Sequence, residues 1–83
     1  MSEHVLKIRR EYFEAVISLK KKFEIRKNDR DYKVGDTLVL NEIDEEGKPT
    51  GKTAIAKVTY ILDTPEFCKE GYVTMSISLA YYY

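Results

Sequence analysis

The chain is poor in the residues that hold metals and form disulfides: its 83 residues include one cysteine, Cys68, and one histidine, His4. A single thiol excludes an internal disulfide and a cysteine-built zinc site. Because Cys68 has no nearby His or Cys cluster that would make it a ligand or a nucleophile, we expect a buried or idle thiol. The sequence therefore predicts neither a metal site nor a cofactor.

Long apolar runs are also missing. No stretch approaches the roughly 20 apolar residues of a membrane helix, and residues 1–4 lack the apolar stretch of a secretory signal. Together with the lone cysteine, this predicts a soluble protein of the reducing cytoplasm with no membrane partner. The length and the hydrophobic fraction of 43% predict one folded domain over residues 1–83 rather than a disordered segment.

Charge is balanced overall but unevenly placed, with fourteen basic and fourteen acidic residues. Residues 1–36 carry ten Lys or Arg against seven Asp or Glu, whereas residues 37–83 carry four against seven. The basic excess is greatest within residues 20–33, a segment suited to attracting an anion. The alternative is a solvated surface whose charges pair with one another.

Hydrophobic periodicity predicts the element order β-α-β-β-β-β. Alternating or short apolar patterns mark the segments that we expect to be strands: residues 4–9, 23–26, 37–40, 54–62 and 72–79. Between the first two strands, apolar residues at helical spacing predict a helix from Glu11 to about Lys22. In the turn before the third strand, Gly35 is expected to serve backbone geometry and Asp36 to form a turn hydrogen bond.

The same patterns predict which side chains face the core. Phe23 and Ile25 are expected to face inward, which sends Glu24 and Arg26 together to the opposite face of their strand. Tyr12 and Phe13 are also expected in the core. In the long strand 54–62, one face is expected to carry Ala54, Ala56, Val58, Tyr60 and Leu62, and in the last strand one side is expected to carry Val73, Met75, Ile77 and Leu79.

Five strands lying flat in so small a domain would expose one large apolar face. Curling the sheet buries that face and removes most of its edges. We therefore predict a mainly β (α+β) fold, a small barrel of about five to six strands with one or two helices and the early helix packed at one end. In this arrangement the helix joins the first two strands as neighbours, and the later strands pair as hairpins.

The segment Leu19–Arg26, LKKKFEIR, resembles a signature of the ASCH (activating signal cointegrator homology) domains, a branch of the PUA-like superfamily. That signature, G-x-K-x-x-E-x-R, lies where the first helix meets the second strand. Lys21, Glu24 and Arg26 match its three charged positions, whereas Leu19 departs from its leading glycine.

More narrowly, residues 4–79 are similar to short bacterial and phage proteins with no assigned function. These read approximately H-x-L-K, then Y-F-x-A-V, then K-x-F-E-I-R-K-N-D-R-D-(Y/F)-x-V-G-D, and finally G-Y-V. The resemblance implies a PUA-like β-barrel, the fold also expected from the strand pattern. It further implies a connection with nucleic acid, since relatives of this fold bind RNA or act on nucleosides.

These observations predict a ligand site in a cleft between the first helix and the barrel. Arg26 offers a planar fork for a phosphate or a base edge, and Lys21 a point charge. Glu24 would hold Arg26 in place or accept from a base amino group. We expect this cleft to bind single-stranded RNA or a nucleotide. The candidate residues are Lys21, Glu24 and Arg26, with Lys7 and His4 from the opening strand and Arg30 and Tyr32 from the following loop as a phosphate contact and a stacking surface.

Each candidate also has a purely structural interpretation. Glu24 and Arg26 would then form only an ion pair that orders the strand, and Arg30 would clamp its loop through its two acidic neighbours. His4, near the terminus, is expected to face solvent rather than to act in catalysis.

A second possible class of function is enzymatic. Small ASCH-related amidohydrolases remove an acyl group from a modified cytidine by means of a Lys, a Thr and a later Glu. Lys21 matches their lysine, but Glu24 stands at the position of their threonine, and the acidic residues after the hairpin have no clear match. Under this alternative Lys21 and Glu24 would take part in catalysis; otherwise no residue is expected to be catalytic.

A third alternative is a protein-interaction module of a transcription-coregulator type. The barrel edge and Tyr81–Tyr83 would then bind a partner chain. These closing tyrosines would extend the last strand, cover the barrel or form a dimer contact, and we expect a monomer or a weak homodimer.

Overall fold

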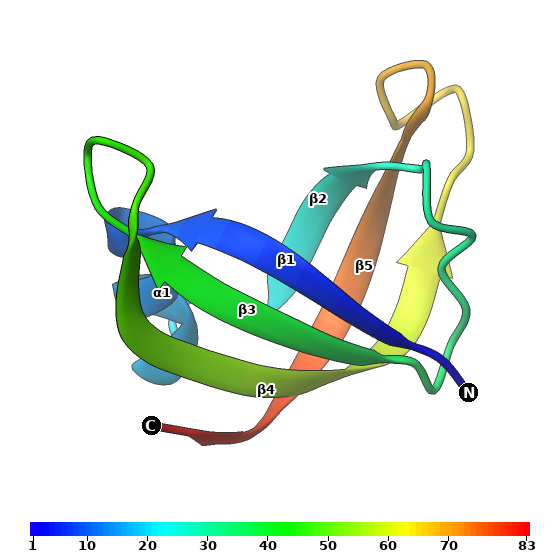
Figure 1. The fold of residues 1–83 in the computed structure, drawn as a ribbon. Coiled ribbons are helices and arrows are strands. Elements are labelled where there is room, and N and C mark those ends of the chain that lie inside the picture. The colour runs from blue at the N-terminus through cyan, green and yellow to red at the C-terminus, as the bar shows by residue number, and fades with distance from the viewer.

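One helix and five strands make up the computed structural model, which describes all residues 1–83. Their order is β1 (Glu3–Arg9), α1 (Arg10–Ile17), β2 (Phe23–Lys27), β3 (Thr37–Ile43), β4 (Pro49–Leu62) and β5 (Tyr72–Tyr82). The strands form one sheet in the order β1-β3-β4-β5-β2, in which only β1 and β3 are parallel. The sheet curls into a half-barrel with α1 at one end (Figure 1). The predicted mainly β fold with an early helix is confirmed.

The core lies between the inner face of the half-barrel and α1. It comprises Leu6, Ile8, Phe13, Val16, Tyr32, Leu38, Leu40, Ala54, Ala56, Val58, Val73, Met75 and Ile77. The expected core position of Tyr12 is wrong, because the inward stripe of this short helix is Phe13 and Val16, and Tyr12 lies about 100° around the axis from Phe13. None of the helices in the structure has the length and the apolar composition that a membrane span needs.

The helix ends earlier than its pattern predicts, at Ile17 instead of near Lys22. Leu19 has a left-handed backbone with φ of 64°. The amide of Lys20 donates to the carbonyl of Ala15 at 2.9 Å, and that of Leu19 donates to Val16 at 3.1 Å. This is a Schellman cap, whose left-handed residue is usually glycine. Leu19 therefore ends α1 in a conformation that glycine adopts without strain.

Bulges bend the long strands and change which side chains face inward. The register between β4 and β5 shifts between Val58 and Tyr60, which inserts an extra residue into the ladder. Tyr60 is consequently exposed and does not share the face of Val58 as expected, and Ile61 packs against the core instead. The alternation expected for β5 is confirmed from Val73 to Ile77.

The closing tyrosines continue the last strand. β5 extends to Tyr82, and the backbones of Tyr83 and Thr53 exchange hydrogen bonds of 2.7 and 2.9 Å. All three tyrosine side chains are exposed, and the rings of Tyr81 and Tyr83 stack with centroids 6.2 Å apart.

The expected pairing of the first two strands is wrong. β1 pairs with β3 and β2 with β5, so β1 and β2 are the two edges of the sheet, although the hairpins β3–β4 and β4–β5 form as expected. The reason lies in α1, which covers the end of the half-barrel instead of a sheet face. The chain therefore crosses the open end from one edge to the other (Figure 1).

The expected orientation of β2 is also wrong. Glu24 pairs with Met75, and Arg26 pairs with Val73, both of which are inward-facing residues of β5. Directly paired residues share a face of the sheet, so Glu24 and Arg26 face the interior. Ile25, which was expected in the core, is 56% exposed.

Candidate functional site

Side chains, not a backbone ladder, connect the two edges of the half-barrel. Arg26 of β2 donates from Nη2 to the carbonyl of Lys7 at 2.8 Å, and Arg30 donates from Nη1 to the carbonyl of Val5 at 3.2 Å. We call this region, residues 3–9 and 23–27 with Arg30, the seam. Its two guanidinium groups satisfy carbonyls of an edge strand that has no backbone partner on this side.

A buried carboxylate organises the cations of the seam. The side chain of Glu24 is 4% exposed and accepts hydrogen bonds from Lys21 through Oε1 and from Arg26 Nε through Oε2, the latter at 2.8 Å. Lys21 and Arg26 are themselves mostly buried. A carboxylate in this position requires charged partners, because burial of a lone charge is very unfavourable. The cluster keeps a net positive charge.

Two aromatic rings accompany the ammonium group of Lys21. Its Nζ lies 4.8 Å from the ring centroid of Phe23 and 5.7 Å from that of Tyr12, and it donates to the carbonyl of Phe23 at 2.7 Å. Cations over aromatic faces are stabilised by the ring quadrupole. Tyr12 and Phe23 are 46% and 43% exposed, so each also presents ring surface to solvent.

A cavity of about 580 Å³, the first hollow, opens beside this cluster. It is lined by Lys7, Ile8, Arg9, Tyr12, Lys21, Phe23, Glu24, Ile25 and Arg26. Four of the predicted site residues, Lys7, Lys21, Glu24 and Arg26, therefore meet at one cavity. Its lining carries four cations and a single carboxylate, which makes it attractive to anions.

Sequence reasoning missed Tyr12 and Phe23, which it assigned to the core. The alternation of β2 shows that two faces exist but not which one is inward. The signal in the sequence was the set of charges. Glu24 can be buried when Lys21 and Arg26 compensate its charge, and its burial places Phe23 on the opposite, open face of β2.

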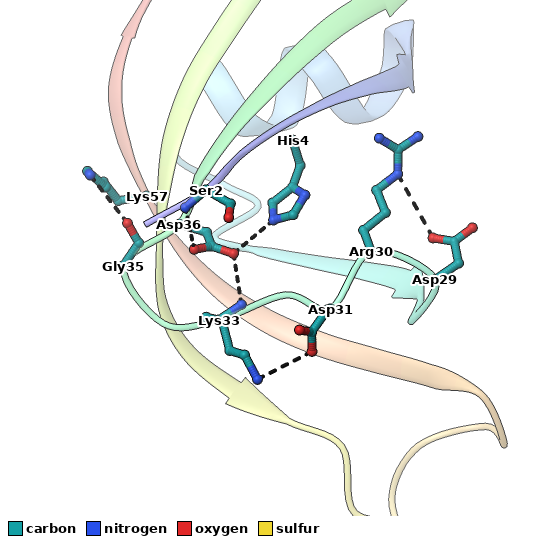
Figure 2. Close-up of polar contacts among 9 residues, drawn as sticks. All are labelled: Ser2, His4, Asp29, Arg30, Asp31, Lys33, Gly35, Asp36 and Lys57. Atoms are coloured by element: carbon teal, nitrogen blue, oxygen red, sulfur yellow. Dashed lines mark hydrogen bonds and ion pairs between the residues drawn. The ribbon is translucent and has the colours of Figure 1, made fainter.

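His4 and Tyr32 lie apart from the first hollow, in a buried cluster around Asp36. His4 Nε2 is 2.8 Å from Asp36 Oδ2, which also accepts from the amide of Lys33 at 2.9 Å, while Oδ1 accepts from the amide of Ser2 at 3.0 Å (Figure 2). The ring centroids of His4 and Tyr32 are 4.7 Å apart. The expected turn hydrogen bond of Asp36 is thus confirmed.

The expected exposure of His4 is wrong, because His4 belongs to the same inward-facing set as Leu6 and Ile8. Tyr32 is also buried, so its ring offers no open surface for stacking a base. These two residues join β1 to the loop that precedes β3, and neither lines the first hollow.

The environment shifts the pKa of both acidic groups in this cluster. Burial alone would raise the pKa of Asp36, but the hydrogen bonds from Ser2, His4 and Lys33 outweigh it and lower the pKa to about 2. Burial raises the pKa of Tyr32, and the positive charges of Arg26 and Arg30 partly oppose that rise. The adjacent turn has Gly35 at φ of 95°, the backbone geometry expected of this glycine.

Arg30 lies on the loop after β2 and is half-exposed. Its Nε is 3.9 Å from Asp29 Oδ1, an exposed contact of little energetic weight (Figure 2). Asp31 pairs with Lys33 instead. The expected clamp by both acidic neighbours is therefore only half present, and the guanidinium of Arg30 remains accessible at the seam.

Other titratable groups gather nowhere into a metal-binding set. No group of three or more His, Cys, Asp or Glu side chains lies close enough to hold a metal ion. Cys68 is half-buried, and its Sγ lies 3.2 Å from the carbonyl of Leu62. Glu42 is buried on β3, with Oε1 accepting from Thr50 at 2.7 Å and Oε2 without a partner.

Comparison with known proteins yields a family and a fold. The chain is 39% identical over 67 residues to an uncharacterized 12.9 kDa protein in the GpA 3′ region of Escherichia phage P2, which covers 81% of this chain and 61% of the phage protein. The chain thus spans about three-fifths of the length of this curated relative.

A solved structure, that of hypothetical protein PH0355, matches 95% of this chain and 99% of its own chain, with a TM-score of 0.62 and 21% identity. At this identity the likeness concerns the fold alone. The family described as a domain of unknown function (DUF3850) matches residues 3–77, and the chain belongs to that family.

Proposed function

We propose that the protein is a binding module for a nucleotide or a short single-stranded RNA, and that the ligand occupies the first hollow. The observation that carries the proposal is the composition of this cavity of about 580 Å³, whose lining combines four cations with two half-exposed aromatic rings. Single-stranded nucleic acids are bound by this combination of positive charge and stacking surface.

Arg26 is the principal phosphate or base-edge ligand in this proposal. Glu24 and the carbonyl of Lys7 fix two edges of its guanidinium, each at 2.8 Å. A guanidinium offers five N–H donors in a planar fork, so donors remain for a ligand. Because the fork is already oriented, a ligand would bind without the entropic cost of ordering it.

Tyr12 and Phe23 supply the stacking surface that was assigned to Tyr32 from the sequence. Stacking of a base on an aromatic side chain contributes about 1–3 kcal/mol. The ammonium group of Lys21 lies over both rings and holds a positive charge at the same place. Glu24 keeps both cations in position.

The ASCH resemblance is consistent with this site, and we propose that the chain is an ASCH-like, PUA-like domain. The positions that match the signature's Lys, Glu and Arg meet in one cluster. Leu19, at the position of the signature's glycine, has the left-handed backbone that glycine favours. The resemblance and the backbone thus point to the same local structure.

The other two functions have less support. As an amidohydrolase base, Lys21 would have to act from an amine that donates to both Glu24 and the Phe23 carbonyl. As an interaction module, the protein would use Tyr81–Tyr83, whose side chains are exposed but form no cavity with the seam.

Fluorescence polarisation with labelled hexaribonucleotides at fixed salt tests the proposal. We expect Arg26→Ala to weaken binding about tenfold, since it removes a charge-assisted contact. Tyr12→Ala should weaken it about fivefold, because it removes a stacking surface and leaves the hydrogen bonds of Glu24 in place. Arg10→Ala is the matched control, because Arg10 is an exposed arginine outside the first hollow. Equal, negligible binding by the wild-type protein and the Arg26 variant would end the proposal.

Incubation with acetylated cytidine, followed by chromatography, addresses the amidohydrolase alternative. We expect no turnover. Deacetylation by the wild-type protein that disappears in Lys21→Ala would instead identify an enzyme. Light scattering with and without residues 80–83 measures whether the closing tyrosines hold a dimer together.

A further inference from the structure

A second cavity, of about 380 Å³, opens on the seam beside the first, and we call it the second hollow. It is lined in part by Lys7, Arg26, Arg30 and Asn41. Lys7 and Arg26 also line the first hollow, so the two cavities are adjacent. The second hollow contains three cationic side chains and no acidic one.

The hydrogen-bonding groups around the second hollow are mostly donors. Arg26 and Arg30 each donate one bond to a β1 carbonyl, which leaves most of their N–H groups without a partner in the protein. Asn41 accepts from Thr53 through its carbonyl oxygen at 2.7 Å, so its amide nitrogen is available to donate. Along a strand, the N–H and C=O of one residue point to the same side, and the amides of Val5 and Lys7 therefore face the seam as well.

The two arginines of the second hollow differ in how strongly acidic partners hold their guanidinium groups. Arg26 is held at its Nε by Glu24, whereas Arg30 is half-exposed and its one acidic contact is the weak one with Asp29. Planar guanidinium groups bind phosphate oxygens through paired N–H donors. Arg30 thus adds a second fork, free of strong partners, next to a fork that is already oriented.

From this geometry we propose that the second hollow is a phosphate subsite, in which Arg26, Arg30 and Lys7 bind the phosphate of a nucleotide whose base stacks in the first hollow. This inference rests on the proposed function and adds a specific requirement to it. The protein selects phosphorylated ligands, and nucleosides without phosphate bind weakly. The phosphate comes either from a terminal monoester or from a diester within an RNA strand, since both present anionic non-bridging oxygens to the guanidinium groups.

Isothermal titration calorimetry separates these possibilities. The ligands are the four common ribonucleosides, their 5′-monophosphates and a hexaribonucleotide, each titrated into wild-type protein and into Arg30→Gln. Arg10→Gln is the matched control, because it removes the same charge from an exposed arginine outside both hollows. Thermal melts of all three proteins report whether the substitutions leave the fold intact.

We expect the monophosphates to bind at least tenfold more tightly than the nucleosides. Arg30→Gln should remove most of that difference and leave nucleoside binding unchanged, while Arg10→Gln changes neither. If only the hexaribonucleotide responds to Arg30→Gln, the subsite serves a diester. For hexaribonucleotide binding, the slope of log K against log salt concentration should then be smaller by about one in Arg30→Gln than in the wild-type protein.

The proposed function and the subsite fail in different ways. Nucleosides and nucleotides that bind equally, or an equal effect of the Arg30 and Arg10 variants, would overturn the subsite and leave the first hollow as a base site. If no nucleotide or RNA binds to the wild-type protein, both proposals fall.

Discussion

The inward orientation of Glu24 on β2 predicts a large loss of stability when its carboxylate is removed. Glu24 is 4% exposed in its side chain and lies between Lys21 and Arg26, whereas Ile25 is 56% exposed. Removing one partner of a buried ion pair costs about 3–5 kcal/mol, because the remaining charge stays buried without compensation. Both cations retain some contact with water, so we expect Glu24→Ala to lower the free energy of unfolding by about 3 kcal/mol.

Ile25→Ala is the matched comparison from the same strand. Truncation of a fully buried Ile to Ala lowers the free energy of unfolding by about 2–5 kcal/mol. Because Ile25 is largely exposed, we expect a loss of only about 1 kcal/mol. Glu14→Ala, at an exposed position of α1, controls for removal of a carboxylate and should change stability by less than about 0.5 kcal/mol.

Urea denaturation followed by circular dichroism measures all three variants. A domain of this size has a total stability of roughly 4–12 kcal/mol, so a loss of about 3 kcal/mol shifts the midpoint clearly. If Ile25→Ala is more destabilising than Glu24→Ala, β2 faces the opposite way and the seam described above does not exist.

Three further predictions concern single residues. At Leu19, whose φ is 64°, we expect Leu19→Gly to be more stable than Leu19→Ala by about 1 kcal/mol in thermal melts. Within the helix, Glu14→Gly should instead be less stable than Glu14→Ala. The same order of stability at both positions would exclude the left-handed cap. The pKa of Asp36 is lowered from 3.8 to about 2, so its contribution to stability is complete above about pH 4 and is lost as the pH falls to about 2. Acid titration of the unfolding free energy should show this loss in the wild-type protein and not in Asp36→Asn. Burial raises the pKa of Tyr32, so ultraviolet titration of Tyr32→Phe should lack one tyrosine that ionises at a higher pH than a free phenol; a missing step at the pH of a free phenol would contradict its burial.

Much of the fold could be predicted because most elements obey local rules. The alternation of β5 places Val73, Met75 and Ile77 inward, as observed. The failures at Tyr60 and Ile25 have tertiary causes. A bulge changes the register of β4 after Val58. In β2, the buried ion cluster turns the charged face of the strand inward and leaves Ile25 outside. Neither a bulge nor the choice of inward face is encoded in a period-two pattern.

The candidate site shows the same division between local and tertiary information. The spacing of Lys21, Glu24 and Arg26 indicated a charged cluster, and these side chains do meet. His4 shares the inward face of Leu6 and Ile8, which alternation could have shown, but its partner Asp36 lies 32 residues away in sequence and could not be identified locally. Sequence periodicity indicates which face of a strand is buried, but it does not identify the distant residue that the fold brings against that face.

The seam couples the stability of this fold to its proposed function. A sheet closed by backbone hydrogen bonds would use the donors and acceptors of both edge strands, and no edge group would remain for a ligand. Here guanidinium groups take the place of those backbone bonds, and each spends a single donor on the β1 strand. Both arginines, held by β1 carbonyls, line the second hollow. A phosphate that binds Arg26 and Arg30 would also connect β1 to β2 and stabilise the open side of the half-barrel, since a ligand that binds only the folded state stabilises it.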